Sequence, residues 1–146
     1  MIRFILGVLA YVVPTFALGF VWHLVLFENY YDALAIYRPD IIIPFGFVSM
    51  LIQAVIFAWI YETSFARRSG GFRARALVYG GVGAVLSWSF TTLAVATKNI
   101  MASVPDYILI ETAFTAAQWI MVAPLTVLAF GAKQAGHHAQ APDAAR

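Results

Sequence analysis

The run FILGVLAYVVPTFALGFVWHLVLF, residues 4–27, decides the fold class, because it continues for 24 residues without Asp, Glu, Lys or Arg. A helix rises about 1.5 Å per residue, so about 20 apolar residues cross a hydrocarbon core about 30 Å thick. Three more runs of apolar character cover residues 41–61, 76–97 and 107–131. They lack the alternating pattern of a barrel strand, the other structure that can span lipid. The sequence therefore predicts an all-α chain, an integral membrane four-helix bundle.

The composition supports the same class. Hydrophobic residues make up 62% of the 146 residues and charged residues 11%, whereas soluble domains average about 25% charged. A soluble fold of this length has too little interior for so much apolar surface. We divide the chain into a four-span domain, residues 1–132, and a polar, alanine-rich tail, residues 133–146, which we expect to be disordered in the cytoplasm. Two histidines in that tail, His137 and His138, are interpreted as incidental.

The basic residues predict the topology. They lie between the apolar runs and are few, so the pI near 9.1 does not indicate a nucleic-acid partner. The residues that would share one side are Arg3, Arg67, Arg68, Arg73, Arg75 and Lys133. By the positive-inside rule this side is cytoplasmic, with both termini, and the outer loops are residues 28–40 and 98–106. We expect a multi-pass protein of the bacterial cytoplasmic (inner) membrane, whose first partner is the lipid bilayer.

Two ionisable residues inside the spans are candidate site residues, because such residues are costly in lipid. His23 lies four residues from the outer end of the first span, and Glu111 lies five residues after Asp106 in the fourth. Both depths are therefore roughly 6–8 Å below the outer surface. We expect the two side chains to face inward, where charge satisfaction and a functional pocket are equally good interpretations. The rim charges that could join them are Arg38, Asp40 and Lys98.

A second polar layer is predicted near the midplane. Gln53 on the second span and Gln118 on the fourth each lie about thirteen residues in from the outer end. Such amides often join helices through hydrogen bonds, and we favour this role over a solute path. The candidate pocket residues are His23, Glu111, Gln53, Gln118, Ser49, Thr115, Trp22 and Trp88.

Small residues recur at four-residue spacing on the third span. They are Gly80, Gly83, Ala84, Ser87 and Thr91. Small side chains let helix backbones approach closely, so this face is predicted to serve packing rather than permeation.

The loops carry two further expectations. The aromatic residues of the first outer loop, Tyr30, Tyr31 and Tyr37, are expected at the level of the lipid headgroups. At the other end, Glu62 can pair with Arg67 or Arg68, and it needs no further role.

Known catalytic and metal-binding patterns are absent from the sequence. Haem or copper ligation would need more than the one intramembrane histidine, and no metal site is expected. The chain has no cysteine. It also lacks the zincin, nucleophile-elbow, phosphate-loop and dinucleotide patterns. We therefore expect neither an enzyme nor a cofactor.

The pattern Gly19-x-x-Trp22-His23, followed by Phe27, Tyr30 and three more spans, resembles small four-span bacterial membrane proteins that are grouped as domains of unknown function. Their pattern has tyrosine after the tryptophan, where this chain has His23. The resemblance implies the four-span layout and suggests no mechanism.

The chain is also similar to small multidrug transporters in its size and number of spans. Those proteins carry their essential acid in the middle of the first span, where this chain has Pro14 and Thr15. Their mechanism therefore does not carry over.

Two hypotheses of function remain. The first is a non-enzymatic accessory or assembly subunit that acts through helix packing, as a homo-oligomer or in a larger membrane complex. The second is an oligomeric small-solute or proton-coupled transporter with an outward-facing polar pocket at His23 and Glu111. Four helices rarely enclose a path, so the second requires a dimer or more. We favour the first narrowly, because interhelical bonding explains most of the polar residues.

Overall fold

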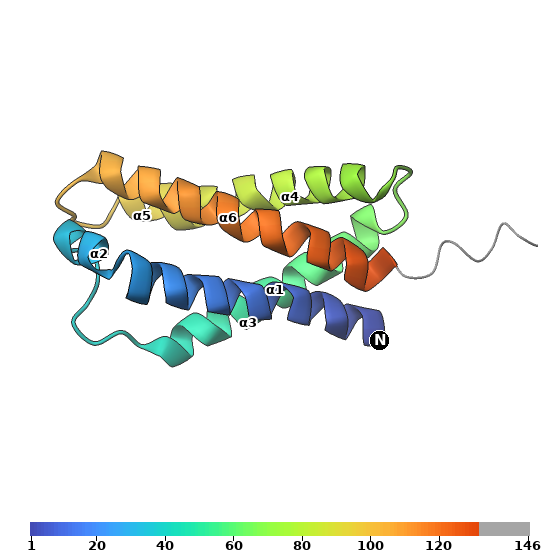
Figure 1. Cartoon of the computed structure of the whole chain (residues 1–146), viewed down its shortest axis with the longest axis horizontal. Helices are drawn as coiled ribbons and strands as arrows, with labels where there is room; N and C mark the ends of the chain where they lie inside the picture. Colours follow the sequence, from blue (N-terminus) through green and yellow to red (C-terminus); the bar gives the residue numbers. More distant parts are fainter. Residues whose placement is uncertain (132–146) are drawn as a thin grey trace, which may run out of the picture.

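The computed structural model of the chain describes residues 1–131, and every regular element within them is helical (Figure 1). The long elements are α1 (Ile2–Val21), α3 (Ile43–Ile60), α4 (Phe72–Trp88) and α6 (Val104–Gly131). Each belongs to a continuous helical stretch that is long and apolar enough to cross a membrane. The prediction of an all-helical chain with four long apolar helices is confirmed. The predicted tail, with His137 and His138, lies outside the described residues.

The long helices run further than the apolar runs that predicted them, most clearly the second and the third. The second helical stretch ends at Phe65, not at residue 61, and the third begins at Phe72, not at residue 76. These added turns contain Glu62, Arg73 and Arg75. Long charged side chains can bury their stems and keep their heads in water, so a helix continues past the point where its apolar run stops.

Helix α6 is central to the bundle. It packs against α1 on one side and α4 on the other, while α3 packs mainly against α1. The N-terminus, the α3–α4 connection and the end of α6 lie together at one end of the bundle (Figure 1). We call this the arginine end, because it carries the arginines at positions 3, 67, 68, 73 and 75. The opposite end carries α2 (Glu28–Leu34) and the α5–α6 connection, and we call it the His23 end.

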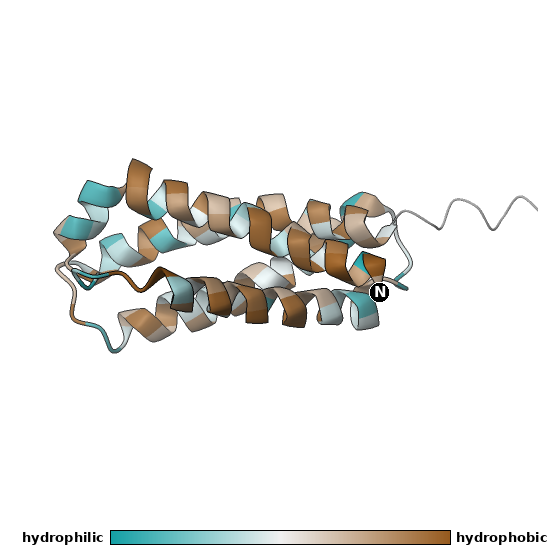
Figure 2. Cartoon of the chain, turned by 90° about the horizontal axis from the view of Figure 1, so that it is seen from below, coloured by the Kyte–Doolittle hydropathy of each residue, from teal (hydrophilic) through white to brown (hydrophobic). Residues whose placement is uncertain are grey.

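An aromatic core fills the bundle from its middle towards the arginine end. Tyr11, Phe57, Tyr61, Tyr79 and Trp119 all belong to one buried cluster. The ring of Trp119 lies 4.8 Å from Phe57 and 5.6 Å from Tyr79, between ring centres. Edge-to-face rings pack densely, so this half of the interior is filled with carbon. Hydrophilic residues gather mainly at the two ends, and hydrophobic residues cover the length between them (Figure 2).

The first three long helices end in a wider, π-helical turn. These turns are η1 (Trp22–Leu26), η2 (Tyr61–Phe65) and η3 (Ser89–Leu93), and η3 leads into the short α5 (Ala94–Ala96). In η1 the amide of Phe27 donates to the carbonyl of Trp22, five residues earlier, at 3.0 Å. Such turns occur often at functional sites. The turn η1 contains His23.

Candidate functional site

The short helix α2 forms a cap over the His23 end. The chain leaves the helical conformation at Phe27 (φ −118°, ψ 18°) and folds back as α2. The cap ends at Ala35, which adopts the left-handed conformation (φ 55°). The amide of Ala102, in the α5–α6 connection, donates to the carbonyl of Leu34 at 2.9 Å. The cap is therefore tied to the connection that leads into α6, the helix that carries Glu111.

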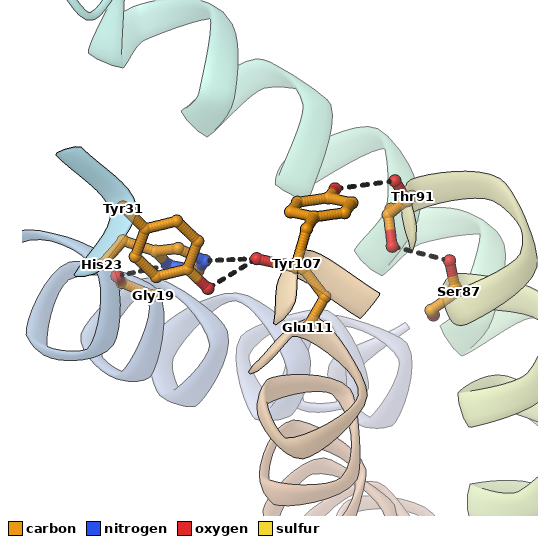
Figure 3. A network of polar contacts seen from close by, with 7 residues as sticks. All are labelled: Gly19, His23, Tyr31, Ser87, Thr91, Tyr107 and Glu111. Atoms are coloured by element: carbon orange, nitrogen blue, oxygen red, sulfur yellow. Dashed lines mark hydrogen bonds and ion pairs between the residues drawn. The ribbon is translucent and has the colours of Figure 1, made fainter. Parts of the chain in front are cut away.

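His23, Tyr31 and Glu111 meet beneath this cap (Figure 3). The ring Nε2 of His23 lies 3.3 Å from Oε1 of Glu111. The hydroxyl of Tyr31 donates to the same oxygen at 2.6 Å. On the other side of the imidazole ring, Nδ1 lies 2.9 Å from the carbonyl oxygen of Gly19. The three side chains come from η1, α2 and α6, so the cluster joins three elements.

These contacts fix the number of protons in the cluster. A carbonyl oxygen only accepts, so Nδ1 of His23 must carry a proton towards Gly19. The contact between Nε2 and Oε1 is attractive only if one more proton lies between His23 and Glu111. The pair is then either imidazolium with carboxylate or neutral imidazole with carboxylic acid. Both arrangements have no net charge, which lowers the cost of placing the pair in an apolar interior.

Tyr31 is the residue of this cluster that the sequence analysis missed. Its ring is fully buried, at 0% exposure, so it faces the interior of the bundle instead of its surface. Burial, reinforced by the bond to Glu111, raises the pKa of the Tyr31 hydroxyl, which keeps it a donor. The ring of Tyr37 stacks on Tyr31 with centres 5.1 Å apart, while Tyr30 is exposed. The signal that could have found Tyr31 was its place one helical turn from Phe27 and Leu34, on the inner face of α2.

Aromatic rings pack around part of the cluster. Phe114 lies 4.6 Å from His23 between ring centres. Trp22 packs at 4.7 Å on Phe27 and at 5.9 Å on Phe114. The indole Nε1 of Trp22 is buried and has no hydrogen-bond partner among residues 1–131. Trp22 was predicted as a candidate pocket residue, and it packs on the aromatic rings beside the cluster.

A pocket of about 310 Å³ opens beside His23, between α1 and the start of α3. His23 and Tyr37 are the lining residues with polar side-chain atoms, and the other lining residues are apolar. Gly46 contributes to the α3 side, where a Cβ atom would meet nothing within 4 Å. The pair of His23 and Glu111 is therefore not sealed: His23 retains 19% of its side-chain exposure and Glu111 retains 10%.

The predicted rim charges do not join the cluster. Arg38 pairs with Asp40 at 3.3 Å, and both side chains are largely exposed. Within the described chain Lys98 forms no ion pair. Their exposure explains this correction: water solvates charges at the rim, so they gain little by approaching a pair that is already neutral.

The predicted midplane layer is a continuous chain of hydrogen bonds. The hydroxyl of Tyr11 donates to Oε1 of Gln53 at 2.7 Å, and the Gln53 amide donates to Ser49 at 3.1 Å. The Gln118 amide lies 3.1 Å from Thr15 Oγ1 and 3.3 Å from the Tyr11 hydroxyl. Helices α1, α3 and α6 are joined by these bonds. Tyr11 is the link that depth in the sequence did not reveal, because tyrosine at that depth also fits an apolar core.

Helix α6 presents a buried face that runs through both polar layers. Glu111, Thr115 and Gln118 are all buried, at 7%, 4% and 5% exposure. Their i, i+4, i+7 spacing places them on one face of the helix. Trp88 differs from expectation, since its indole donates to Thr112 at 2.9 Å on the outer seam of α4 and α6, away from the pocket.

The face of α4 with small residues packs closely on α6. Gly83 is buried, and a Cβ atom there would overlap the ring of Trp119. The Trp119 indole donates to Ser87 at 3.1 Å, and Tyr107 of α6 donates to the carbonyl of Thr91 at 3.4 Å. Figure 3 includes the Tyr107–Thr91 contact at the edge of the His23 cluster.

Outside this seam, α4 and α6 border an apolar groove of about 560 Å³. Its floor includes Gly80, Gly81, Ala84, Ala116 and Ala123. We call this surface the α4–α6 groove.

Two further findings bear on the class of the protein, one on metal-binding groups in the described residues and one on similar proteins. Residues 1–131 contain no group of three or more His, Cys, Asp or Glu side chains that could hold a metal ion. Comparison of the chain with protein-family models, curated proteins and solved structures gave no match. The class supported by the fold is a multi-pass helical membrane protein.

Proposed function

We propose that the chain is a non-enzymatic accessory or assembly protein of the bacterial inner membrane, which acts by packing against a second copy of itself. A larger membrane complex would use the same surface. Both termini lie in the cytoplasm in this proposal. The support for that orientation is the segregation of arginine: the arginine end carries five of them in the described chain, at positions 3, 67, 68, 73 and 75.

The observation that carries the proposal is the α4–α6 groove. Its lining combines small residues with two long apolar side chains that protrude from the surface. Leu77 is 75% exposed and Ile120 is 74% exposed. A face with both a recess and protruding side chains can pack on a second copy of itself about a two-fold axis, because each protrusion fills the recess of the other copy. In lipid, association depends on such close packing because the acyl chains are as apolar as leucine.

The interior also favours packing over passage through one chain. The amide of Gln53 both accepts and donates a hydrogen bond, so it acts as interhelical glue. Beyond this layer the aromatic core fills the bundle towards the arginine end. A polar solute that entered at His23 would reach the midplane layer, whose polar groups already bond to one another, and then the aromatic core.

The test is self-association in lipid vesicles, measured by energy transfer between labelled chains. Gly81→Leu places a larger side chain in the groove. We expect the monomer to fold, because a Cβ at Gly81 meets nothing within 4 Å. We expect it to weaken the dimer by about tenfold or more, which corresponds to about 1.4 kcal/mol.

The matched control is Gly46→Leu, the same substitution at an open position on α3, away from the groove. It should leave association unchanged. A chain that stays monomeric at every density, or an equal loss in both variants, would contradict the proposal.

A second candidate function is a small-solute or proton-coupled transporter, working as an oligomer. The specific observation in its favour is the 3.3 Å contact of His23 with Glu111 beside an open pocket. One proton shared between a base and an acid is the arrangement that a proton carrier needs.

A further inference from the structure

A second pocket, of about 290 Å³, lies at the arginine end and is not part of the surfaces described above. Four elements and a connection contribute to it. Its charged residues come from α1 (Arg3), η2 (Glu62), α4 (Arg75) and the α3–α4 connection (Arg67). Phe130 and Gly131 of α6 close its apolar side. Helices distant in the sequence therefore bring three guanidinium groups to one cavity.

Within residues 1–131, the positive charge in this pocket is only partly balanced. The ion pairs of residues 1–131 are His23–Glu111 and Arg38–Asp40, so Glu62 pairs with neither Arg67 nor Arg68. The pocket contains three arginines and one carboxylate. The reason for the absent pairing is exposure: Glu62 and Arg67 are both on the solvated surface, where pairing yields little free energy.

Two buried polar groups at this place lack partners. The Nε of Arg75 is buried and forms no hydrogen bond among the described residues. The hydroxyl of Tyr61 is in the same condition, although its side chain is 0% exposed and the Arg75 guanidinium lies close enough to interact with it. A buried donor without an acceptor is rare and costly. Arg75 lines the pocket, so an acceptor bound there would satisfy its Nε.

We propose that this pocket binds a phosphate ester, with its phosphate held by Arg75, Arg67 and Arg3. The planar guanidinium fork matches two phosphate oxygens at once, and three forks suit an anion with several oxygens better than a single carboxylate. Glu62 then accepts from a hydroxyl of the same molecule. A phosphate ester of a polyol has both features, and it occurs either as the headgroup of an anionic lipid or as a free metabolite.

The experiment titrates the full chain, in detergent micelles, with dihexanoyl phosphatidylglycerol and follows the complex by native mass spectrometry. We expect saturable binding of one lipid per chain. Arg75→Gln should raise the Kd by about tenfold or more, because it removes charged hydrogen bonds. Arg67→Gln should act in the same direction, and its exposed side chain makes it safe for folding if Arg75→Gln does not fold.

The control is Arg68→Gln, which removes the same charge from the next residue but does not line the pocket. It should leave the Kd unchanged. Competition by glycerol 3-phosphate would identify a free phosphate ester as the source, and a lack of competition would identify the lipid headgroup. The proposal is overturned if neither compound binds, or if Arg68→Gln weakens binding as much as Arg67→Gln.

Discussion

At the residue scale, His23 and Glu111 form a pair that needs no outside charge. One proton between Nε2 and Oε1 makes the pair neutral, and the Gly19 carbonyl and the Tyr31 hydroxyl orient its two ends. Both bonds to the carboxyl group end on Oε1. A polar cluster of this kind specifies how α2 sits on the bundle, whether or not it also binds a ligand.

The same pair separates the two candidate functions by a measurement of proton entry. We expect vesicles that contain the chain to take up protons, under an imposed potassium diffusion potential, no faster than empty vesicles. The physical reason is the hydrogen-bonded midplane layer and the aromatic core. Faster uptake that is lost in Glu111→Gln but kept in the control Glu62→Gln would contradict packing as the only role and favour the transporter.

At the element scale, the sequence predicted the long helices well and the cap poorly. Hydrophobic length determines a membrane helix, so four of them followed from the apolar runs. Helix α2 has only seven residues and mixed polarity, so neither length nor periodicity marked it. The depths of His23 and Glu111 were predictable, whereas their contact was not, because depth does not determine the rotation of a helix. Tyr31 and Tyr11 were missed since tyrosine suits an interface, a core and a polar link equally.

The seam of α4 and α6 gives a prediction at the same scale. Gly83→Ala would force a methyl group into the ring of Trp119, which is 3% exposed and has little room to move. We expect it to lower the free energy of unfolding by about 1–3 kcal/mol, the usual cost of overpacking. The measurement is unfolding in detergent at a dilution that keeps the chain monomeric.

The control for this substitution lies two residues away on the same helix. At Gly81 a Cβ meets open space, so Gly81→Ala should be neutral or stabilise the helix by up to about 1 kcal/mol. If Gly83→Ala were as stable as Gly81→Ala, the close approach of α4 to Trp119 would not exist in the folded protein.

At the scale of the whole molecule, the two ends of the bundle differ in chemistry. The His23 end holds a neutral, hydrogen-bonded cluster under a cap, and the arginine end holds a pocket lined by three arginines and one glutamate. The aromatic core separates them. This polarity suits a protein that meets anionic headgroups on one side of the membrane only, and it makes orientation the property on which the other proposals depend.

The orientation can be measured cleanly because the chain has no cysteine of its own. Asn99→Cys at the His23 end and Ser69→Cys at the arginine end are both exposed positions, and neither substitution changes the charge that sets the topology. On intact bacterial cells, a membrane-impermeant maleimide should label Asn99→Cys at once and Ser69→Cys only after the membrane is permeabilised. The reverse pattern would place the arginine end outside, against the positive-inside rule. It would also remove the cytoplasmic lipid surface as the source of a ligand for Arg75, while leaving the contacts within the bundle as they are.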